Sequence, residues 1–297
     1  MYLKVSKRIT TTIACLFTIF IFIFCCCRFF KKEPSQIIPI KVMYGLPVID
    51  VNIQGHPLQL ILDLGAHFSG LSKEAIEKVQ LIKELKTTNS MDAFGNNFVH
   101  RVFSTSKVLI GNYLLPHLEF NEINDFNDDF GDPTQKTLIY GHIGREPFLD
   151  KVLFIDRKNQ FCVVEKAHFS KKIDLEKYHP GKWIEADFSL DKGLGIKLNV
   201  IIDSKEKKEL ILDTGSNASI IDKNCSSEEP FSLNSKKEEM SFTLSDETPL
   251  GKLPFYFLDC SKARLQGILG FDFFDHYMIC FDFLNKKVFL KKYESDE

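Results

Sequence analysis

Several residue patterns that mark common enzyme classes are missing from this sequence of 297 residues. It contains no H-E-x-x-H and no G-x-S-x-G, so nothing points to a zinc peptidase or to a serine hydrolase with a nucleophile elbow. No C-x-x-C pair occurs outside the N-terminal segment, which removes support for zinc-ribbon and thioredoxin-like sites. The net charge is -2, and Lys and Arg form no stripe interleaved with aromatic residues, so we expect no nucleic-acid partner.

Cysteine is too scattered to build a disulfide framework. Four of the eight cysteines lie in one N-terminal apolar segment, at Cys15, Cys25, Cys26 and Cys27. The other four are spread over the rest of the chain, at Cys162, Cys225, Cys260 and Cys280. We expect most of the cysteines to be small buried apolar residues.

Charge is absent from Ile9 to Cys27, and most residues of this segment are apolar. A helix rises about 1.5 Å per residue, so a run of this length nearly crosses a hydrocarbon core about 30 Å thick. We therefore predict a membrane anchor over residues 1–32, with a single transmembrane helix. The remainder of the chain would then be tethered to the membrane through its N-terminus.

Two other interpretations of the apolar segment find less support. A cleaved signal peptide needs a small-x-small site after the apolar run, and none follows. A lipoprotein signal needs a small residue before the modified cysteine, whereas Phe24 precedes Cys25. Basic residues flank the segment on both sides, so the positive-inside rule does not orient it. We expect the soluble part to be extracytoplasmic, because an N-terminal apolar segment commonly serves as an export signal-anchor.

After a predicted linker at residues 33–40, alternating apolar and polar residues favour β-strands. Three hairpins are expected, with turns at Gln54-Gly55, near Gly95-Asn96 and at Gly111-Asn112. One helix is predicted over residues 72–85, where apolar residues follow a serine with helical spacing.

An acidic, turn-rich segment at residues 123–135 has the composition of a calcium loop but not its pattern. With Asp125 counted as the first position of an EF-hand loop, Phe130 stands where glycine is needed and Lys136 where glutamate is needed. The segment is interpreted as a solvated loop. We expect neither a metal ion nor another cofactor.

Two parts of the sequence are similar to each other. Residues 60–71 (LILDLGAHFSGL) and 210–221 (LILDTGSNASII) are identical at six of twelve positions. Residues 141–164 and 267–290 align without a gap, and each begins with Gly-x-x-Gly and ends as a strand, an Asp/Asn turn and another strand. A repeat of this length indicates two homologous β-rich lobes rather than a solenoid.

The fold class predicted from this duplication is all-β. The boundary between the two lobes is placed near residue 177, where Pro180 and Gly181 punctuate the chain. Residues 41–176 are called the first repeat below, and residues 177–297 the second repeat.

Each repeat carries an Asp-x-Gly sequence directly after an apolar run, at Asp63 and at Asp213. A carboxylate at the end of a buried strand needs hydrogen-bond donors, and the following glycine lets backbone amides approach it. Two such sites facing each other would share a proton, because two adjacent carboxylates cannot both ionise readily. The ionised partner could take a proton from water while the protonated partner donates to a carbonyl oxygen, which is general acid-base hydrolysis of an amide.

The sequence LILDTGSNASII resembles the active-site pattern of aspartic peptidases of the retropepsin and pepsin type, and GILG at residues 267–270 resembles the later apolar-apolar-Gly motif of that family. The first repeat carries looser versions, LILDLGAHFS and GHIG. The resemblance implies two β-barrel lobes with a cleft between them, a peptide or protein substrate, and catalysis by Asp63 and Asp213. It also implies supporting roles around the two active-site loops for Gly65, Thr214, Gly215, Ser216, Gly144 and Gly270. One chain with both lobes would act as a monomer, with a homodimer as the alternative.

Two residues depart from the pattern of this family. The resemblance implies a threonine after each catalytic aspartate, whose hydroxyl links the two loops. Thr214 fits, but Leu64 has no hydroxyl. His142 stands where an apolar residue is expected, and His67 lies four residues after Asp63. We interpret both histidines as structural. The departures leave open a catalytically inactive relative that binds peptides or partner proteins.

The same family covers its cleft with hairpin flaps. The resemblance places a first flap at residues 91–99 and a second at residues 243–251, which lacks a central glycine. We therefore expect two unequal flaps, with two ordinary hairpins at the sheet edges as the alternative, because hairpins are common in all-β folds.

Overall fold

The computed structural model describes residues 35–80, 83–91, 95–123, 139–169, 171–191, 193, 195–203, 206–225, 237–244, 246 and 248–294. The predicted membrane anchor at residues 1–32 lies outside the described residues, as does nearly all of the acidic segment at 123–135. Within the part of the chain that the structure describes, no helix is long and apolar enough to span a bilayer.

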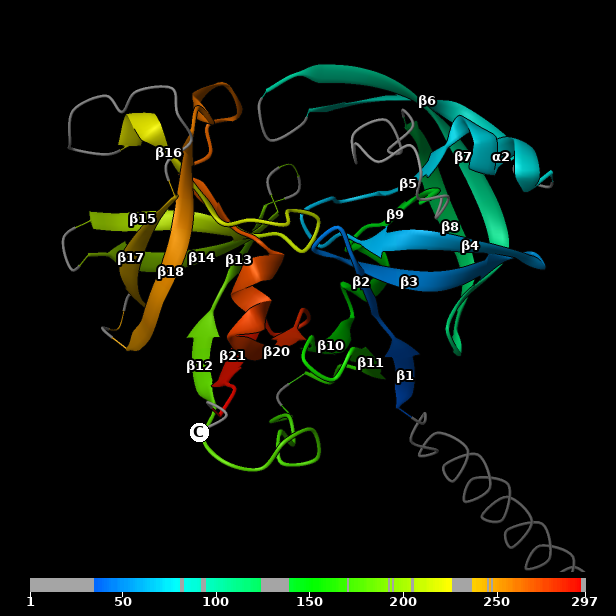
Figure 1. Ribbon diagram of the computed structural model, residues 1–297. Helices are drawn as coiled ribbons and strands as arrows, with labels where there is room; N and C mark the ends of the chain where they lie inside the picture. The colour runs from blue at the N-terminus through cyan, green and yellow to red at the C-terminus, as the bar shows by residue number, and fades with distance from the viewer. Residues whose placement is uncertain are drawn as a thin grey trace, which may run out of the picture. The chain divides into compact units, whose positions relative to one another are not determined.

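The described residues are mostly β-strands, and the strands form three sheets (Figure 1). Within these residues, the sheet of the first repeat has eight strands in the order β2 (Lys41–Met43), β3 (Leu46–Ile53), β4 (His56–Leu62), β9 (Gly141–Ile143), β5 (Ser69–Ser72), β8 (Tyr113–Ile123), β7 (Asn97–Ile110) and β6 (Lys83–Met91). The sheet of the second repeat has seven, in the order β13 (Ser189–Asp191), β14 (Gly195–Ile202), β15 (Glu206–Leu212), β19 (Gly267–Leu269), β16 (Ile220–Asp222), β18 (Pro249–Leu258) and β17 (Lys237–Leu244).

A third sheet is shared by the two repeats. Its six described strands are β1 (Gln36–Pro39), β11 (Phe161–Lys166), β10 (Lys151–Asp156), β20 (Tyr277–Asp282), β21 (Lys287–Lys292) and β12 (Ile184–Asp187). The duplicated terminal hairpins, β10–β11 and β20–β21, lie side by side because β10 pairs with β20. The remaining elements are short helices: α2 (Lys73–Lys78) and the 3₁₀ turns η2 (Glu146–Phe148), η3 (Lys223–Cys225), η4 (Ser261–Ala263) and η5 (Phe271–Asp275).

The three predicted hairpin turns are confirmed. Ile53 pairs with His56 across Gln54-Gly55, and Ile110 pairs with Tyr113 across Gly111-Asn112. The hairpin of β6 and β7 turns between Met91 and Asn97. These turns fix the register of the sheet that carries the first Asp-x-Gly loop.

Two local predictions are wrong. The predicted linker contains the edge strand β1, because Ile38 is buried in the core and β1 pairs with β11. The predicted helix at 72–85 begins as expected, with Ser72 accepting a hydrogen bond from the amide of Ala75, but α2 ends at Lys78. Residues from Lys83 onward instead form β6, whose backbone pairs with β7. Hydrogen bonding to β7 therefore outweighs the helical spacing of the apolar residues.

The shared sheet buries side chains on both of its faces. Leu153 and Ile155 of β10 belong to the main apolar cluster, whereas Phe154 between them belongs to a second cluster. The ring of Tyr178, from the segment that joins the repeats, stacks on Phe154 at 4.6 Å. Because strands of both repeats alternate in this way, the sheet holds the two halves of the chain together. Three of the cysteines predicted to be buried are so, and they form no disulfide among the described residues: Cys162, Cys260 and Cys280.

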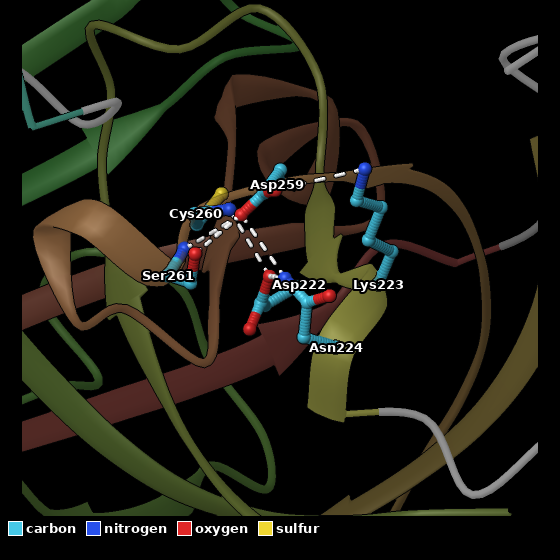
Figure 2. Close-up of polar contacts among 6 residues, drawn as sticks. All are labelled: Asp222, Lys223, Asn224, Asp259, Cys260 and Ser261. Atoms are coloured by element: carbon cyan, nitrogen blue, oxygen red, sulfur yellow. Dashed lines mark hydrogen bonds and ion pairs between the residues drawn. The ribbon is translucent and has the colours of Figure 1, made fainter. Parts of the chain in front are cut away.

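The buried carboxyl group of Asp222 fixes the end of β16 to the turn η4 (Figure 2). Its Oδ1 accepts hydrogen bonds from the backbone amide of Cys260 at 3.0 Å and from the side-chain amide of Asn224 at 3.3 Å. Asp259 lies beside the same turn but is about half exposed, and it forms an ion pair with Lys223 at 3.6 Å. The two aspartates therefore differ in burial although they stabilise the same turn.

Replacing Asp222 by alanine should lower the free energy of unfolding by about 1–3 kcal/mol, because the buried amide of Cys260 loses its acceptor. Asp259→Ala is the matched control and should cost clearly less than Asp222→Ala, because an exposed ion pair contributes little. Denaturant unfolding of the full-length variants gives both values. Equal losses in the two variants would contradict the role assigned to Asp222.

Candidate active site

The two Asp-x-Gly loops begin at matching places in the two repeats. Asp63 directly follows β4, and Asp213 directly follows β15. Each of these strands runs parallel to the short strand of its Gly-x-x-Gly motif, β9 or β19. The backbone amide of Asp63 donates to the carbonyl of Ile143 at 2.9 Å, and the amide of Asp213 donates to that of Leu269 at 3.0 Å. The duplicated sequence motifs therefore place both aspartates in the same local frame.

The structure brings the two aspartates together, each against the loop of the other repeat. A Cβ atom placed on Gly65 would lie 2.6 Å from Oδ2 of Asp213 and closer still to the rest of that carboxyl group. A Cβ atom on Gly215 would meet the Asp63 carboxyl group in the same way, at 2.7 Å from Oδ2. No side chain fits at either glycine without moving a carboxyl group. The glycine of each Asp-x-Gly therefore shapes the site of the opposite aspartate.

Backbone amides and a mutual hydrogen bond satisfy the two carboxyl groups. The amide of Ala66 donates to Oδ1 of Asp63 at 2.9 Å, and the amide of Gly215 donates to Oδ1 of Asp213 at 2.8 Å. A further hydrogen bond joins the two carboxyl groups. A bond between two carboxyl groups requires a proton on one of them, since ionised carboxylates only accept.

Loss of hydration raises the pKa of both aspartates. The pKa of Asp213 rises to about 8, with burial as the main cause and the negative charge of Asp63 as the second. For Asp63, the amide of Ala66, the bond to Asp213 and the positive charge of Arg145 oppose the effect of burial. The environments therefore favour Asp63 as the ionised member of the pair and Asp213 as the protonated member.

Thr214 links the two loops through a single hydroxyl group. Its Oγ1 donates to the carbonyl of Leu62 at 2.6 Å and accepts from the amide of Leu64 at 2.8 Å. Thr214 and Leu64 are both fully buried. The side chain of Leu64, at the matching position of the first repeat, packs in the apolar core. The link expected from Thr214 is therefore present, and Leu64 cannot supply a hydroxyl for a reciprocal one.

The glycines of the Gly-x-x-Gly motifs back the two loops. The amide of Gly144 donates to Oγ of Ser69 at 3.1 Å, and the amide of Gly270 donates to Oγ of Ser219 at 3.1 Å. The carbonyl of Ser216 accepts from the amide that follows Gly270. Sequence reasoning missed the serines as site residues, although Ser69 and Ser219 are among the six identities of the repeat.

The two histidines have structural surroundings, as the sequence analysis expects. His142 shares a hydrogen bond of 3.1 Å between Nε2 and the carbonyl of Phe68, and burial lowers its pKa to about 4. The His67 ring packs edge-on against Phe68 with ring centroids 4.3 Å apart. A neutral His142 supports the first loop from behind without adding charge to the aspartate pair. Among the described residues, no group of three or more His, Cys, Asp and Glu side chains could hold a metal ion.

The hairpin of β6 and β7, the first predicted flap, reaches the other repeat at its tip. Gly95 has a φ of +81°, and a Cβ atom there would lie 2.5 Å from Cβ of Lys262 in η4. Residues 92–94 of the predicted flap lie outside the described residues. The tip therefore rests on η4, the turn that Asp222 fixes to β16 (Figure 2).

The second predicted flap, at residues 243–251, is wrong. β17 pairs with β14 at Leu244 and Val200, as β7 pairs with β3 at the matching positions of the first repeat. The turn that follows β17 therefore corresponds to the turn at Gly111-Asn112 and not to the flap. The Tyr277 hydroxyl from the shared sheet donates to the carbonyl of Leu250 and fixes the turn there. Among the described strands of the second repeat, none takes the place of β6.

No protein-family model matches the chain, and no curated protein matches it in sequence. The structure is similar to the crystal structure of aspartic proteinase from Irpex lacteus, with a TM-score of 0.57. The match covers 87% of this chain and 97% of that chain, at 13% sequence identity. The chain therefore has a mostly β, pepsin-like fold, as the resemblance of the two Asp-x-Gly motifs implied.

The raised pKa of Asp213 predicts a pH-dependent loss of stability. In the folded chain Asp213 keeps its proton up to about pH 8, whereas the ordinary pKa of an aspartate is 3.8. Raising the pH across this window therefore favours unfolding. The stabilisation that the bound proton gives is fully present below the ordinary pKa and is lost as the pH rises through the pKa of Asp213 in the folded chain. The stability of the wild type relative to Asp213→Asn should therefore fall between about pH 4 and about pH 8.

Urea unfolding of the full-length proteins at a series of pH values measures this difference. Asp150→Asn serves as the control, because that side chain is 69% exposed and lies outside the site. Its difference from the wild type should be nearly constant. A pH-independent difference for Asp213→Asn would contradict the raised pKa.

Proposed function

We propose that the chain is an aspartic endopeptidase that hydrolyses peptide bonds with a water molecule activated by Asp63 and Asp213. One observation carries the proposal: two carboxyl groups from different repeats approach each other against the glycine of the opposite loop. Their surroundings favour opposite protonation states, which is the requirement for one base and one acid acting together.

The mechanism assigns one proton transfer to each aspartate. Ionised Asp63 takes a proton from the attacking water, whose oxygen bonds to the peptide carbonyl carbon. Asp213 gives its proton to the carbonyl oxygen, and a tetrahedral diol forms. In the next step Asp63 returns its proton to the leaving nitrogen, Asp213 recovers its proton from the diol, and the C–N bond breaks. Both aspartates thus return to the protonation states in which they started.

The substrate is a peptide or protein segment that lies in a cleft between the two repeats. The β6–β7 hairpin supports this placement, because its tip at Gly95 crosses from the first repeat to Lys262 of the second. The hairpin would have to lift from η4 to admit an extended peptide and would close on it afterwards. In this proposal a monomer supplies both aspartates.

A catalytically inactive, peptide-binding protein is the competing proposal, and Leu64 is the observation that favours it. Half of the hydroxyl linkage expected between the loops is missing at this residue. An inactive protein would bind a peptide and leave it intact. Mass spectrometry of a peptide library after long incubation at high protein concentration separates the two functions.

Asp63→Asn and Asp213→Asn should each lower the cleavage of such a library by about 10²–10⁴-fold, because each removes one of the two proton transfers. Turnover by the full-length proteins is measured between pH 3 and pH 7, a range chosen roughly to bracket a carboxyl pair. The exposed control, Asp150→Asn, should cleave as the wild type does. Full activity in either site variant would remove that aspartate from the mechanism.

We also propose that residues 1–32 anchor the protein in a membrane and that the remainder is extracytoplasmic. Support comes from the uncharged run between Ile9 and Cys27. The full-length protein should stay with membranes through alkaline carbonate extraction, and a reporter at its C-terminus should be accessible only from the extracytoplasmic side. Release by carbonate would contradict the anchor, and a cytoplasmic reporter would contradict the orientation.

A further inference from the structure

Arg145 is a fully buried arginine directly behind the first Asp-x-Gly loop. It follows Gly144, and the matching residue of the second repeat is Phe271. The backbone amides of both residues make equivalent bonds, from Arg145 to the Ala66 carbonyl at 3.0 Å and from Phe271 to the Ser216 carbonyl at 2.6 Å. The two repeats therefore place a cation and an aromatic ring at the same point of the same local structure.

The guanidinium group of Arg145 crosses from the first repeat to the second. Its Nη1 donates to the carbonyl of Gly65 at 2.6 Å and lies 3.5 Å from the carbonyl of Leu64. Its Nη2 donates to the carbonyl of Asp191 in β13 at 2.9 Å. One side chain thus holds the loop that follows Asp63 and the strand β13 of the other repeat.

Arg145 joins the two repeats at the first Asp-x-Gly loop, where Leu64 stands in place of a residue with a hydroxyl group. Thr214 ties the second loop to Leu62 and Leu64 of the first repeat, whereas Leu64 has no group to reach back. Asp191 pairs with Gly195, and Ile196, the next residue, pairs with Leu212 at the end of β15. Arg145 therefore ties the first loop to the sheet that carries the second aspartate.

We propose that Arg145 is a positioning residue for Asp63, which replaces the missing hydroxyl link and keeps Asp63 the ionised member of the pair. Its effect on turnover rests on the proposed function, whereas its effect on the link between the repeats does not. The planar guanidinium group of an arginine suits this task, because its several N–H donors can bond two carbonyl groups in fixed directions at once.

Electrostatics support the second part of the proposal. The charged groups in range of Arg145 are Asp63, Asp213 and Asp191, and all three favour its charged form. The positive charge in turn lowers the pKa of Asp63 against the effect of burial. His142 also lies near the pair, and burial lowers its pKa to about 4, so it is neutral above that pH. Arg145 is therefore the cation that distinguishes Asp63 from Asp213.

The test compares Arg145→Met, which removes the charge and the donors, with Arg145→Lys, which keeps the charge but not the planar guanidinium group. Arg145→Met should lower kcat by about 10²-fold with little change in KM, because the base is misplaced while peptide contacts remain. The acidic limb of the kcat/KM profile should move to higher pH in Arg145→Met and return towards the wild-type position in Arg145→Lys.

Arg157→Met is the matched control. Arg157 is also largely buried, and it pairs with Asp275 at 2.9 Å and covers the ring of Phe271 at 4.4 Å, without acting on either aspartate of the pair. This variant should lose stability but keep the position of the acidic limb. An acidic limb that stays in place in Arg145→Met, or that moves equally in both methionine variants, would overturn the proposal.

A rescue experiment covers the case in which Arg145→Met folds poorly. Leu64→Thr restores a hydroxyl at the position that matches Thr214, so it should raise the Tm and the kcat of the Arg145→Met protein. In the background with Arg145 intact it should only lower stability, because it removes buried apolar surface. Additive Tm changes in this double-mutant cycle would show that Arg145 does not replace the link.

The proposed function and the role of Arg145 can be overturned separately. Unchanged cleavage in Asp63→Asn would overturn the proposed function but leave the coupling of Tm values between Leu64 and Arg145 as a valid test of the link. Loss of cleavage in Asp63→Asn together with additive Tm changes and an unmoved acidic limb would overturn only the role of Arg145.

Discussion

Two carboxyl groups from different repeats approach each other closely, and the loops, the glycines and the shared sheet are arranged around that approach. Asp63 and Asp213 each lie where a Cβ atom of the opposite glycine would be, so both glycines are required by space alone. Carboxyl groups this close and this poorly hydrated resist a second ionisation, so the pair holds one proton to a higher pH than a lone carboxyl group does. The shared sheet and the Gly-x-x-Gly motifs hold the loops in place against this cost, through bonds that match one another in the two repeats.

Asymmetry between the repeats gives the two carboxyl groups different chemical characters. The hydroxyl group of Thr214 ties the second loop to the first, whereas the buried cation Arg145 ties the first loop to β13 of the second repeat. The cation stabilises negative charge on Asp63, and that charge helps to keep the proton on Asp213. In the mechanism proposed above, the departure at Leu64 is thus accompanied by a substitute, Arg145, that also distinguishes the base from the acid.

The sequence predicts the aspartates, the glycines and Thr214 of the site, but it misses the repeated serines Ser69 and Ser219 and the buried Arg145. Asp63, Asp213, their glycines and the hairpin turns follow from motifs, because strand ends and two-residue turns are set locally. Arg145 has no counterpart, since Phe271 takes its place, and only the structure shows which carbonyls it reaches. The strand β1 was mispredicted because pairing with the distant strand β11 decides it, and the helix was predicted too long because its last residues pair with β7. The second flap was mispredicted because the pairing of β17 with β14 puts its turn in the place of Gly111-Asn112.

Titration of the aspartate side-chain carbons by ¹³C NMR tests the central claim most directly. The assigned signals of Asp63 and Asp213 are followed with pH in the full-length protein. A shared proton predicts two well-separated macroscopic steps, with the second proton retained by the pair well above the ordinary value of 3.8 and released near pH 8. Two independent carboxyl groups that both titrate near that ordinary value would contradict the account.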